Sequence, residues 1–253
     1  MIRVVRALLR EIDKEWGEMC RGVTYKPLLF DHLPKCGGSS LNRYLESNYL
    51  RRKTYSLHHR NHGSLVEEFL KMSESKRYSY NLIKGHRAHE LVDYVAPECL
   101  KVTVFREPID RVVSHYYYAK GKVDHYLHRR IVEGEMDLAE YVKSGVSAEL
   151  SNWYTVHFSG LSAEEVKINP EKAAKEAMQI VRGKYDIVGF LEEFDAFLSQ
   201  LKRQAGFIHD FPSRRANVTK DRLCLTDIDP GVLEVVEEYN RADVLLYRAL
   251  LSQ

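Results

Sequence analysis

Two short apolar runs, each followed at once by residues typical of an anion-binding loop, constrain the fold of this chain most strongly. Residues 26–33 lead into Pro34-Lys35-Cys36-Gly37-Gly38-Ser39-Ser40, and residues 100–105 lead into Arg106 and a segment that reaches Ser114. Apolar runs of this length, the second rich in β-branched residues, favour buried strands. Loops that join a strand to a helix hold anions on backbone amides and guanidinium groups. Two such loops indicate a ligand with two separated anionic groups.

The rest of the chain alternates between predicted strands and predicted helices. Further strands are expected at residues 81–85 and 185–190, whereas the basic, histidine-rich residues 51–63 are expected to form a loop. The expected helices are residues 41–49, 64–72, 108–120, 123–133, 138–143, 171–182, 192–204 and 230–251. Because alternating strands and helices form parallel sheets covered on both faces, we predict an α/β fold. Its form would be a three-layer, P-loop-type domain with a central parallel sheet flanked by helices.

The chain shows no repeat and no linker-like segment, so one domain is expected over residues 1–253. Residues 1–22 carry apolar side chains on one helical face and predict an amphipathic helix that packs on this domain. The alternative for this helix is binding at a membrane surface.

Composition restricts the partners and the compartment. The net charge of the 253 residues is +2, which does not favour binding to nucleic acid, so anion binding must be local. No apolar run approaches the roughly 20 residues of a transmembrane helix. The four cysteines form no C-x-x-C pair, which indicates reduced thiols and a cytoplasmic protein without a zinc site.

The first loop has the chemistry of a phosphate cradle. Gly37 and Gly38 let the backbone approach a ligand, and Ser39 or Ser40 is expected to cap the following helix. Lys35 precedes the glycines, so the loop does not match the Walker A motif, in which the lysine follows them. The structural alternative is a tight turn with a serine cap and a solvated lysine.

The second loop strengthens the prediction that this chain binds an anionic ligand. Arg106 directly follows a predicted strand, where its guanidinium can hold a phosphate with two hydrogen bonds. Ser114 lies about two helical turns later and reaches the same group only if the chain bends back. Arg111 can instead pair with Glu107 one turn earlier.

Both loops resemble those of a known enzyme family. PKCGGSSL, at residues 34–41, resembles the 5′-phosphosulfate loop of sulfotransferases that use 3′-phosphoadenosine 5′-phosphosulfate, and FREPIDRVVSHYYY, from Phe105, resembles their 3′-phosphate segment. The branch that it resembles most includes heparan sulfate 2-O-sulfotransferase and chondroitin sulfotransferases. Further matches in the same order are IKGH (83–86), NWYTVHFSG (152–160), YDIVGFLEEFDAF (185–197), RRANVTK (214–220) and YNRADVLLYRALL (239–251).

The resemblance implies roles for particular residues. The 5′-phosphosulfate would be held by Lys35, Gly37, Gly38, Ser39 and Ser40, the 3′-phosphate by Arg106 and Ser114, and the stretch with Asn217, Thr219 and Lys220 would close over the nucleotide. Cys36 stands within this loop where the family often has threonine. We hypothesise that alkylating reagents modify the Cys36 thiol and that bound nucleotide protects it.

Sulfuryl transfer to a hydroxyl needs a proton acceptor and stabilisation of the leaving phosphate. A histidine suits the first role and Lys35 the second. His86 matches the family's catalytic Gly-His pair, and His89 or His32 competes with it; a mechanism without a histidine base is the remaining option. His58, His59 and His62 lack acidic partners at metal-binding spacing, so no metal is expected.

The resemblance therefore implies an enzyme that moves a sulfuryl group from 3′-phosphoadenosine 5′-phosphosulfate to a hydroxyl of a glycan or glycoconjugate, releasing adenosine 3′,5′-bisphosphate. The alternatives are a P-loop kinase or NTPase and a non-catalytic nucleotide- or glycan-binding module. Basic and aromatic residues at 51–60 and 116–130 either line a groove for the acceptor or form solvated faces.

Overall fold

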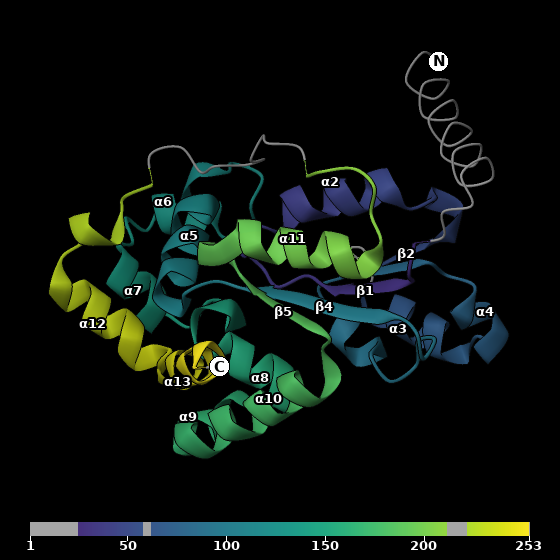
Figure 1. The fold of residues 1–253 in the computed structure, drawn as a ribbon. Helices are drawn as coiled ribbons and strands as arrows, with labels where there is room; N and C mark the ends of the chain where they lie inside the picture. Colours follow the sequence, from purple (N-terminus) through teal and green to yellow (C-terminus); the bar gives the residue numbers. More distant parts are fainter. Residues whose placement is uncertain (1–24, 58–61, 212–221, 253) are drawn as a thin grey trace, which may run out of the picture. The chain divides into compact units, whose positions relative to one another are not determined.

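A computed structural model describes residues 25–57, 62–211 and 222–252 (Figure 1). The helix predicted at residues 1–22 lies outside this range. The chain divides into two compact units, one containing residues up to 104 together with 185–216, the other containing residues 105–184 together with 217–253. That the whole chain acts as one domain stays a prediction.

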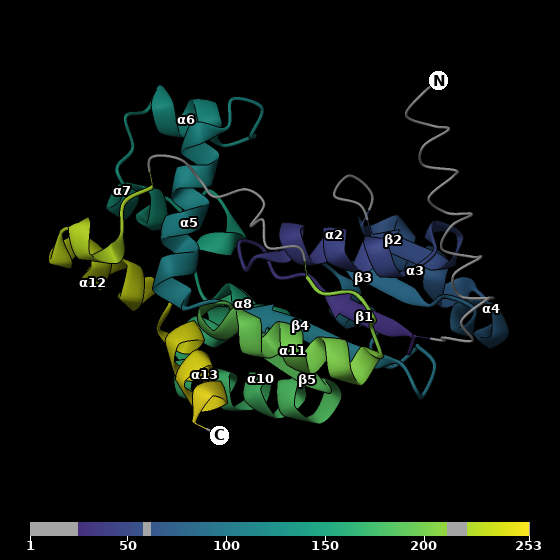
Figure 2. The same cartoon turned by 45° about the horizontal axis from the view of Figure 1, so that its top comes forward.

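The first unit is built on a five-stranded parallel sheet, as predicted. The strands follow the order β2-β3-β1-β4-β5 across the sheet (Figure 2), and their bounds are β1 (Leu28–Asp31), β2 (Thr54–Leu57), β3 (Leu82–Gly85), β4 (Leu100–Phe105) and β5 (Ile187–Phe190). In the central strand, Asp31 is opposite Gly85 on one side and Thr103 on the other. The chain therefore leaves β1 and β3 at the same edge of the sheet, where parallel sheets bind their ligands.

Helices cover both faces of this sheet. Helices α2 (Gly38–Asn48) and α11 (Phe194–Ala205) share one apolar core with the strands, whereas α3 (His62–Lys71) and the 3₁₀ turn η2 (Ala88–Leu91) pack on the opposite face (Figure 1). On β5, a β-carbon added to Gly189 would meet the Phe197 ring at 2.3 Å, so α11 lies close against the strand. The predicted three-layer α/β arrangement is confirmed.

The second unit is helical. Its helices are α5 (Pro108–Gly121), α6 (His128–Val132), α7 (Leu138–Lys143), α8 (Trp153–Ser159), α9 (Ala163–Ile168), α10 (Pro170–Lys184), α12 (Pro230–Tyr239) and α13 (Arg241–Leu251). One core lies among α5, α7 and α12, while α10 packs against α8 and α13.

Two predicted secondary-structure elements were wrong. Residues 51–57, expected as loop, form a 3₁₀ turn (Arg51–Lys53) and the strand β2, whose Tyr55 and Leu57 side chains are buried in alternation. The C-terminal helix is broken in two at Asn240, which is fully buried. Its side-chain amide donates to the carbonyl oxygens of Leu150 and Val236, both at 2.9 Å. Helical periodicity does not predict the break, because the hydrogen bond to Leu150 joins residues that are far apart in the sequence. A short helix, α4 (Glu74–Tyr78), completes the first unit.

Candidate active site

The first predicted anion loop connects β1 to α2 through two left-handed residues. Lys35 has a φ of 65° and Gly37 a φ of 77°, and Gly37 is the N-cap of α2. No side chain caps this helix, so the predicted serine cap is wrong; Ser39 and Ser40 lie within the first turn instead. The start of an uncapped helix presents backbone N–H groups and partial positive charge, which is the chemistry that an anionic group requires.

Gly38 is needed because an imidazole ring lies against its α-carbon. A β-carbon added at this position would come within 1.9 Å of Cδ2 and Nε2 of His32. The ring cannot yield easily, because it stacks between the rings of Phe30 and His86, at 5.4 and 4.3 Å between centroids. The loop and these histidines therefore form one packed group.

Gly38→Ala is expected to destabilise the protein by about 1–3 kcal/mol, since overpacking forces a ring or the backbone to move. Gly183→Ala is the matched control, because an added β-carbon there meets nothing within 4 Å and Gly183 lies inside α10. That change should be neutral or stabilise by about 0.5–1 kcal/mol. Urea unfolding of both variants makes the comparison, and equal stability would show that the His32 ring does not fill this space.

Cys36 lies in the loop but faces inward. It is 1% exposed, and its thiol donates to the carbonyl oxygen of Pro34 at 3.3 Å. A buried thiol reacts slowly with alkylating reagents. The structure therefore contradicts the expectation of a readily labelled thiol, and only the main chain of Cys36 is left to contact a ligand.

His86 directly follows β3, and its ring forms a hydrogen bond with His32, the residue that directly follows β1. Its Nδ1 lies 2.5 Å from the main-chain oxygen of His32, and the two rings are stacked with an angle of 28° between their planes. A carbonyl oxygen only accepts hydrogen bonds, so Nδ1 of His86 carries a proton, and in a neutral ring the lone pair is then on Nε2. A neutral imidazole with an accepting Nε2 is the form that a general base requires.

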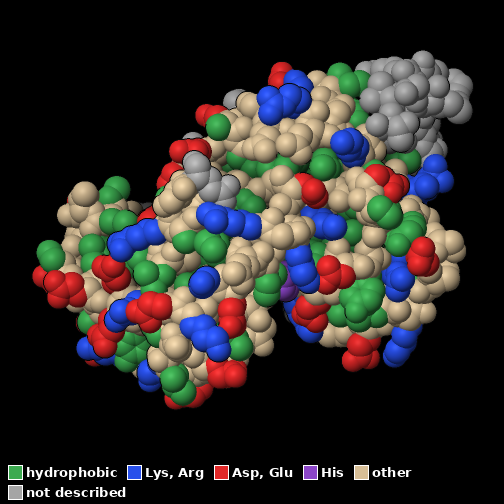
Figure 3. Space-filling model, turned by 60° about the horizontal axis from the view of Figure 1, so that its bottom comes forward, with side chains coloured by type: hydrophobic (Ala, Val, Ile, Leu, Met, Phe, Trp, Pro, Cys, Tyr) green, Lys and Arg blue, Asp and Glu red, His purple; other side chains and the backbone are tan. Residues whose placement is uncertain are grey.

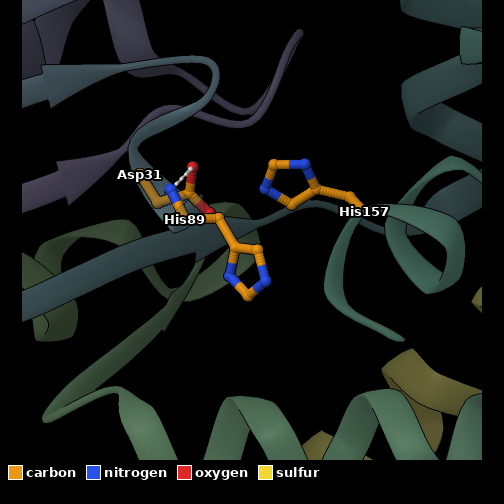
Figure 4. A group of neighbouring side chains, drawn as sticks. All are labelled: Asp31, His89 and His157. Carbon is orange, nitrogen blue, oxygen red and sulfur yellow. Dashed lines mark hydrogen bonds between the residues drawn. The ribbon is translucent and has the colours of Figure 1, made fainter. Parts of the chain in front are cut away.

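His89, the competing candidate, belongs to a second buried cluster. Figure 4 shows Asp31 with the main-chain N–H of His89 donating to it, at 3.3 Å. The Tyr185 hydroxyl donates to the other carboxylate oxygen at 2.9 Å, and it lies 3.1 Å from Nδ1 of His89. Burial, and then the charge of Asp31, raises the pKa of Tyr185 well above its usual value, so the hydroxyl stays protonated. Nδ1 of His89 is thus also engaged in a hydrogen bond.

Sequence reasoning missed Asp31 and Tyr185. Asp31 stands inside an apolar run and is fully buried, and Tyr185 lies 154 positions away in the chain. A carboxylate within a buried strand was the signal, since such a group is kept only where partners satisfy it. The sequence alone does not indicate that Tyr185 is the partner of Asp31.

In the second unit, Arg106 follows β4 and shares a carboxylate with a second arginine. Its guanidinium contacts Oδ2 of Asp110 through Nε at 2.7 Å and Nη2 at 2.6 Å, while Arg222 pairs with Oδ1 of the same residue. The Asp110 carboxylate thus bridges the two guanidinium groups. Burial, followed by repulsion from Arg106, lowers the pKa of Arg222 to about 10. Arg222 was not singled out in the sequence, because nothing near it in the chain indicates this pairing.

Tyr154 fixes the main chain of Arg106 through two hydrogen bonds. Its N–H donates to the Tyr154 hydroxyl at 3.2 Å, and that hydroxyl donates to its carbonyl oxygen at 3.1 Å. Ser114 is 4% exposed and lies four residues after Asp110 in α5, so the two share a helical face. The second loop thus holds the main chain of Arg106 in place directly before α5.

The NWYTVHFSG and YNRAD segments, far apart in sequence, dock on each other. Asn152 accepts hydrogen bonds from the N–H groups of Ala242 and Asp243, and the Asp243 carboxylate accepts from Thr155 N–H at 2.8 Å. Asp243 faces the fully buried Arg111, whose Nη2 is 4.0 Å from Oδ2. Arg111 therefore has Asp243 as its ion-pair partner, in place of the predicted Glu107, which accepts from the Asp110 N–H at the start of α5.

Several predicted residues lie outside the described part of the chain. Asn217, Thr219 and Lys220 are among them, as are His58 and His59. Their predicted roles stay predictions.

The sequence profile of the sulfotransferase family matches residues 24–248. The chain belongs to the sulfotransferase family. Among solved structures, a sulfotransferase from Alicyclobacillus acidocaldarius aligns with 91% of this chain and 97% of its own, at 13% identity and a TM-score of 0.43. No curated protein sequence matches the chain. The family predicted from the two loops is confirmed, whereas the carbohydrate branch is not distinguished from the rest of the family.

Two surface properties of this sulfotransferase bear on its partners. Within the described residues, no helix is both long and apolar enough to cross a membrane. On the face shown in Figure 3, basic and acidic side chains are interspersed, in keeping with the net charge of +2.

Proposed function

We propose that this sulfotransferase transfers the sulfuryl group of 3′-phosphoadenosine 5′-phosphosulfate to a carbohydrate hydroxyl, with His86 as the general base. The observation that carries this proposal is the pairing of the uncapped start of α2 with the packed His32–His86 group at the same edge of the sheet. The first feature suits a phosphosulfate and the second supplies a proton acceptor beside it.

In the proposed step, the acceptor oxygen attacks sulfur as the bond from sulfur to the bridging 5′-phosphate oxygen breaks. His86 Nε2 takes the hydroxyl proton, and adenosine 3′,5′-bisphosphate leaves. Lys35 and the first-turn amides of α2, with Gly37, Gly38, Ser39 and Ser40, stabilise the charge that develops on the phosphate. Arg106 and Ser114 are assigned to the 3′-phosphate, and Asn217, Thr219 and Lys220 to closure over the nucleotide.

A transfer assay with labelled donor tests this function. We expect label to move to glycans in a panel that also contains lipids and small alcohols, with the product identified by mass spectrometry. Adenosine 3′,5′-bisphosphate should bind far more tightly than ATP. A kinase or NTPase would reverse this order of affinities, and a non-catalytic module would bind the bisphosphate without transferring label.

Arg106→Ala is expected to weaken the binding of adenosine 3′,5′-bisphosphate roughly 10- to 100-fold, the worth of one or two hydrogen bonds to a charged group. Arg106→Lys should recover only part of this loss, because lysine cannot form the bidentate contact. Arg129→Ala is the control, since Arg129 is an exposed arginine paired with Glu133 in α6. Calorimetric titration makes the measurement, and an unchanged affinity in Arg106→Ala would remove Arg106 from the site.

A carbohydrate acceptor is supported by exposed aromatic rings in residues 116–130. The His125 ring contacts those of Tyr118 and Tyr126, at 5.5 and 4.8 Å between centroids, and Tyr126 is 70% exposed. Aromatic faces with a neighbouring cation, here Lys122 at 5.2 Å from the Tyr118 ring, suit acidic sugars. Tyr126→Ala should raise the KM for the acceptor and leave nucleotide affinity unchanged.

A further inference from the structure

A chain of hydrogen bonds runs from Lys84 to the His32 ring. Lys84 lies on β3 with its side chain 11% exposed, and its Nζ donates to Glu46 Oε1 at 2.5 Å and to Asn42 Oδ1 at 3.3 Å. An ammonium group has donors only, so the Asn42 atom that faces it must be the carbonyl oxygen. The other end of the amide, Nδ2, therefore faces Nδ1 of His32 at 3.2 Å.

This chain determines the protonation of His32. An amide NH₂ can only donate, so Nδ1 of His32 accepts and its proton resides on Nε2. A proton added at Nδ1 would point at the Asn42 NH₂ group, which disfavours the charged ring. Asp31, next to His32 in the chain, accepts hydrogen bonds from the Tyr185 hydroxyl and the His89 N–H, and Arg87, next to His86, pairs with Glu90. His32 is therefore held neutral.

The two stacked rings consequently carry opposite tautomers. His86 has its proton on Nδ1, donated to the main-chain oxygen of His32, whereas His32 has its proton on Nε2. When both rings are neutral, only that of His86 has its lone pair on Nε2. An uncharged His32 also places no positive charge 4.3 Å from the ring that must accept a proton.

We propose that His32 is the positioning residue of the His86 base: its carbonyl oxygen sets the His86 tautomer, and the Lys84–Asn42 pair keeps its ring neutral. This inference rests on the proposed role of His86. It also resolves one choice that the sequence left open, because it removes His32 itself from the candidate bases.

Nuclear magnetic resonance of the full-length protein labelled with ¹⁵N-histidine tests the assignment without turnover. Long-range ¹H–¹⁵N spectra distinguish protonated from lone-pair ring nitrogens, and His32→Gln and His86→Gln assign the signals. We expect a protonated Nε2 and bare Nδ1 for His32, and the reverse for His86. The same tautomer in both rings, or a charged His32 at neutral pH, would overturn the proposal even if His86→Ala proved inactive.

Asn42→Asp tests the consequence for activity. A carboxylate accepts a proton from Nδ1 and favours a charged His32 ring, which lowers the pKa of the neighbouring His86. We expect kcat to fall about 10-fold and the acid limb of the pH–rate profile to move to lower pH, with nucleotide affinity unchanged. Ser47→Ala, an exposed position on the same helix, is the control. A lower kcat with an unmoved acid limb would mean that Asn42 only supports the fold.

Lys84→Met provides a second variant should Asn42→Asp fail to fold. Without the ammonium group, the Asn42 amide is no longer oriented, so the His32 nitrogen signals should shift toward an average of the two tautomers. Lys84→Gln retains a donor to Asn42 and should restore the wild-type signals. Unchanged signals in Lys84→Met would show that Lys84 does not set the tautomer.

Discussion

His86→Ala is expected to lower the rate of sulfuryl transfer by about 10²- to 10⁴-fold, the usual contribution of a general base. Adenosine 3′,5′-bisphosphate should bind with nearly unchanged affinity, because the imidazole takes the acceptor proton and is not assigned a contact with the nucleotide. Single-turnover transfer of labelled donor, together with calorimetric titration, separates the two effects.

His89→Ala is the informative comparison, since Nδ1 of His89 is also engaged in a hydrogen bond. We expect this variant to retain most of the transfer rate. If His89→Ala loses turnover while His86→Ala keeps it, the base is His89 and the Asp31–Tyr185 pair is its support. If both variants retain turnover, the mechanism does not use a histidine base.

Asp243→Asn is expected to reduce the free energy of unfolding by about 3–5 kcal/mol, the cost of leaving one member of a buried ion pair alone. Asp243 and Arg111 are both fully buried, and Nε and Nη1 of Arg111 have no hydrogen-bond partner. Without the carboxylate charge, the guanidinium keeps only the Glu149 carbonyl oxygen and the faces of Trp153 and Tyr154. Urea unfolding measures the change.

The double variant Arg111→Met/Asp243→Asn is the control for this effect. Removing both charges should recover much of the stability lost in Asp243→Asn, because the penalty arises from the unpaired charge. If the double variant loses as much free energy of unfolding as the two single variants together, the two residues do not interact. Arg241→Ala, which breaks an exposed pair with Glu171, should cost less than about 1 kcal/mol.

Much of the fold was predictable because it depends on local patterns. The β-branched residues of β4 and the proline at the start of α5 gave bounds close to those observed. The break at Asn240 and the strand β2 were missed, since Asn240 is positioned by Leu150 and β2 by its pairing with β3. Such contacts join residues that are distant in the sequence.

The residues of the candidate site also fall into those that local sequence predicted and those that it did not. The glycines and Lys35 were found from the sequence because backbone approach and a mobile charge are properties of single residues. The cap of α2 and the inward Cys36 thiol were predicted wrongly, because both depend on how the turn folds back on Pro34 and Gly37. Arg222 and Tyr185 were missed, since their partners Asp110 and Asp31 are remote in the chain.

Motifs and periodicity were enough to predict the family, the parallel α/β architecture and the two loops that the proposal assigns to the two ends of one nucleotide. Residue type and short-range order are sufficient for these properties. The tertiary structure was needed to show which group faces each Nδ1 of His32 and His86, and the proposed tautomers rest on these contacts. A tautomer depends on whether each ring nitrogen faces a donor or an acceptor, and folding alone brings Asn42, Lys84 and the His32 carbonyl oxygen to those positions.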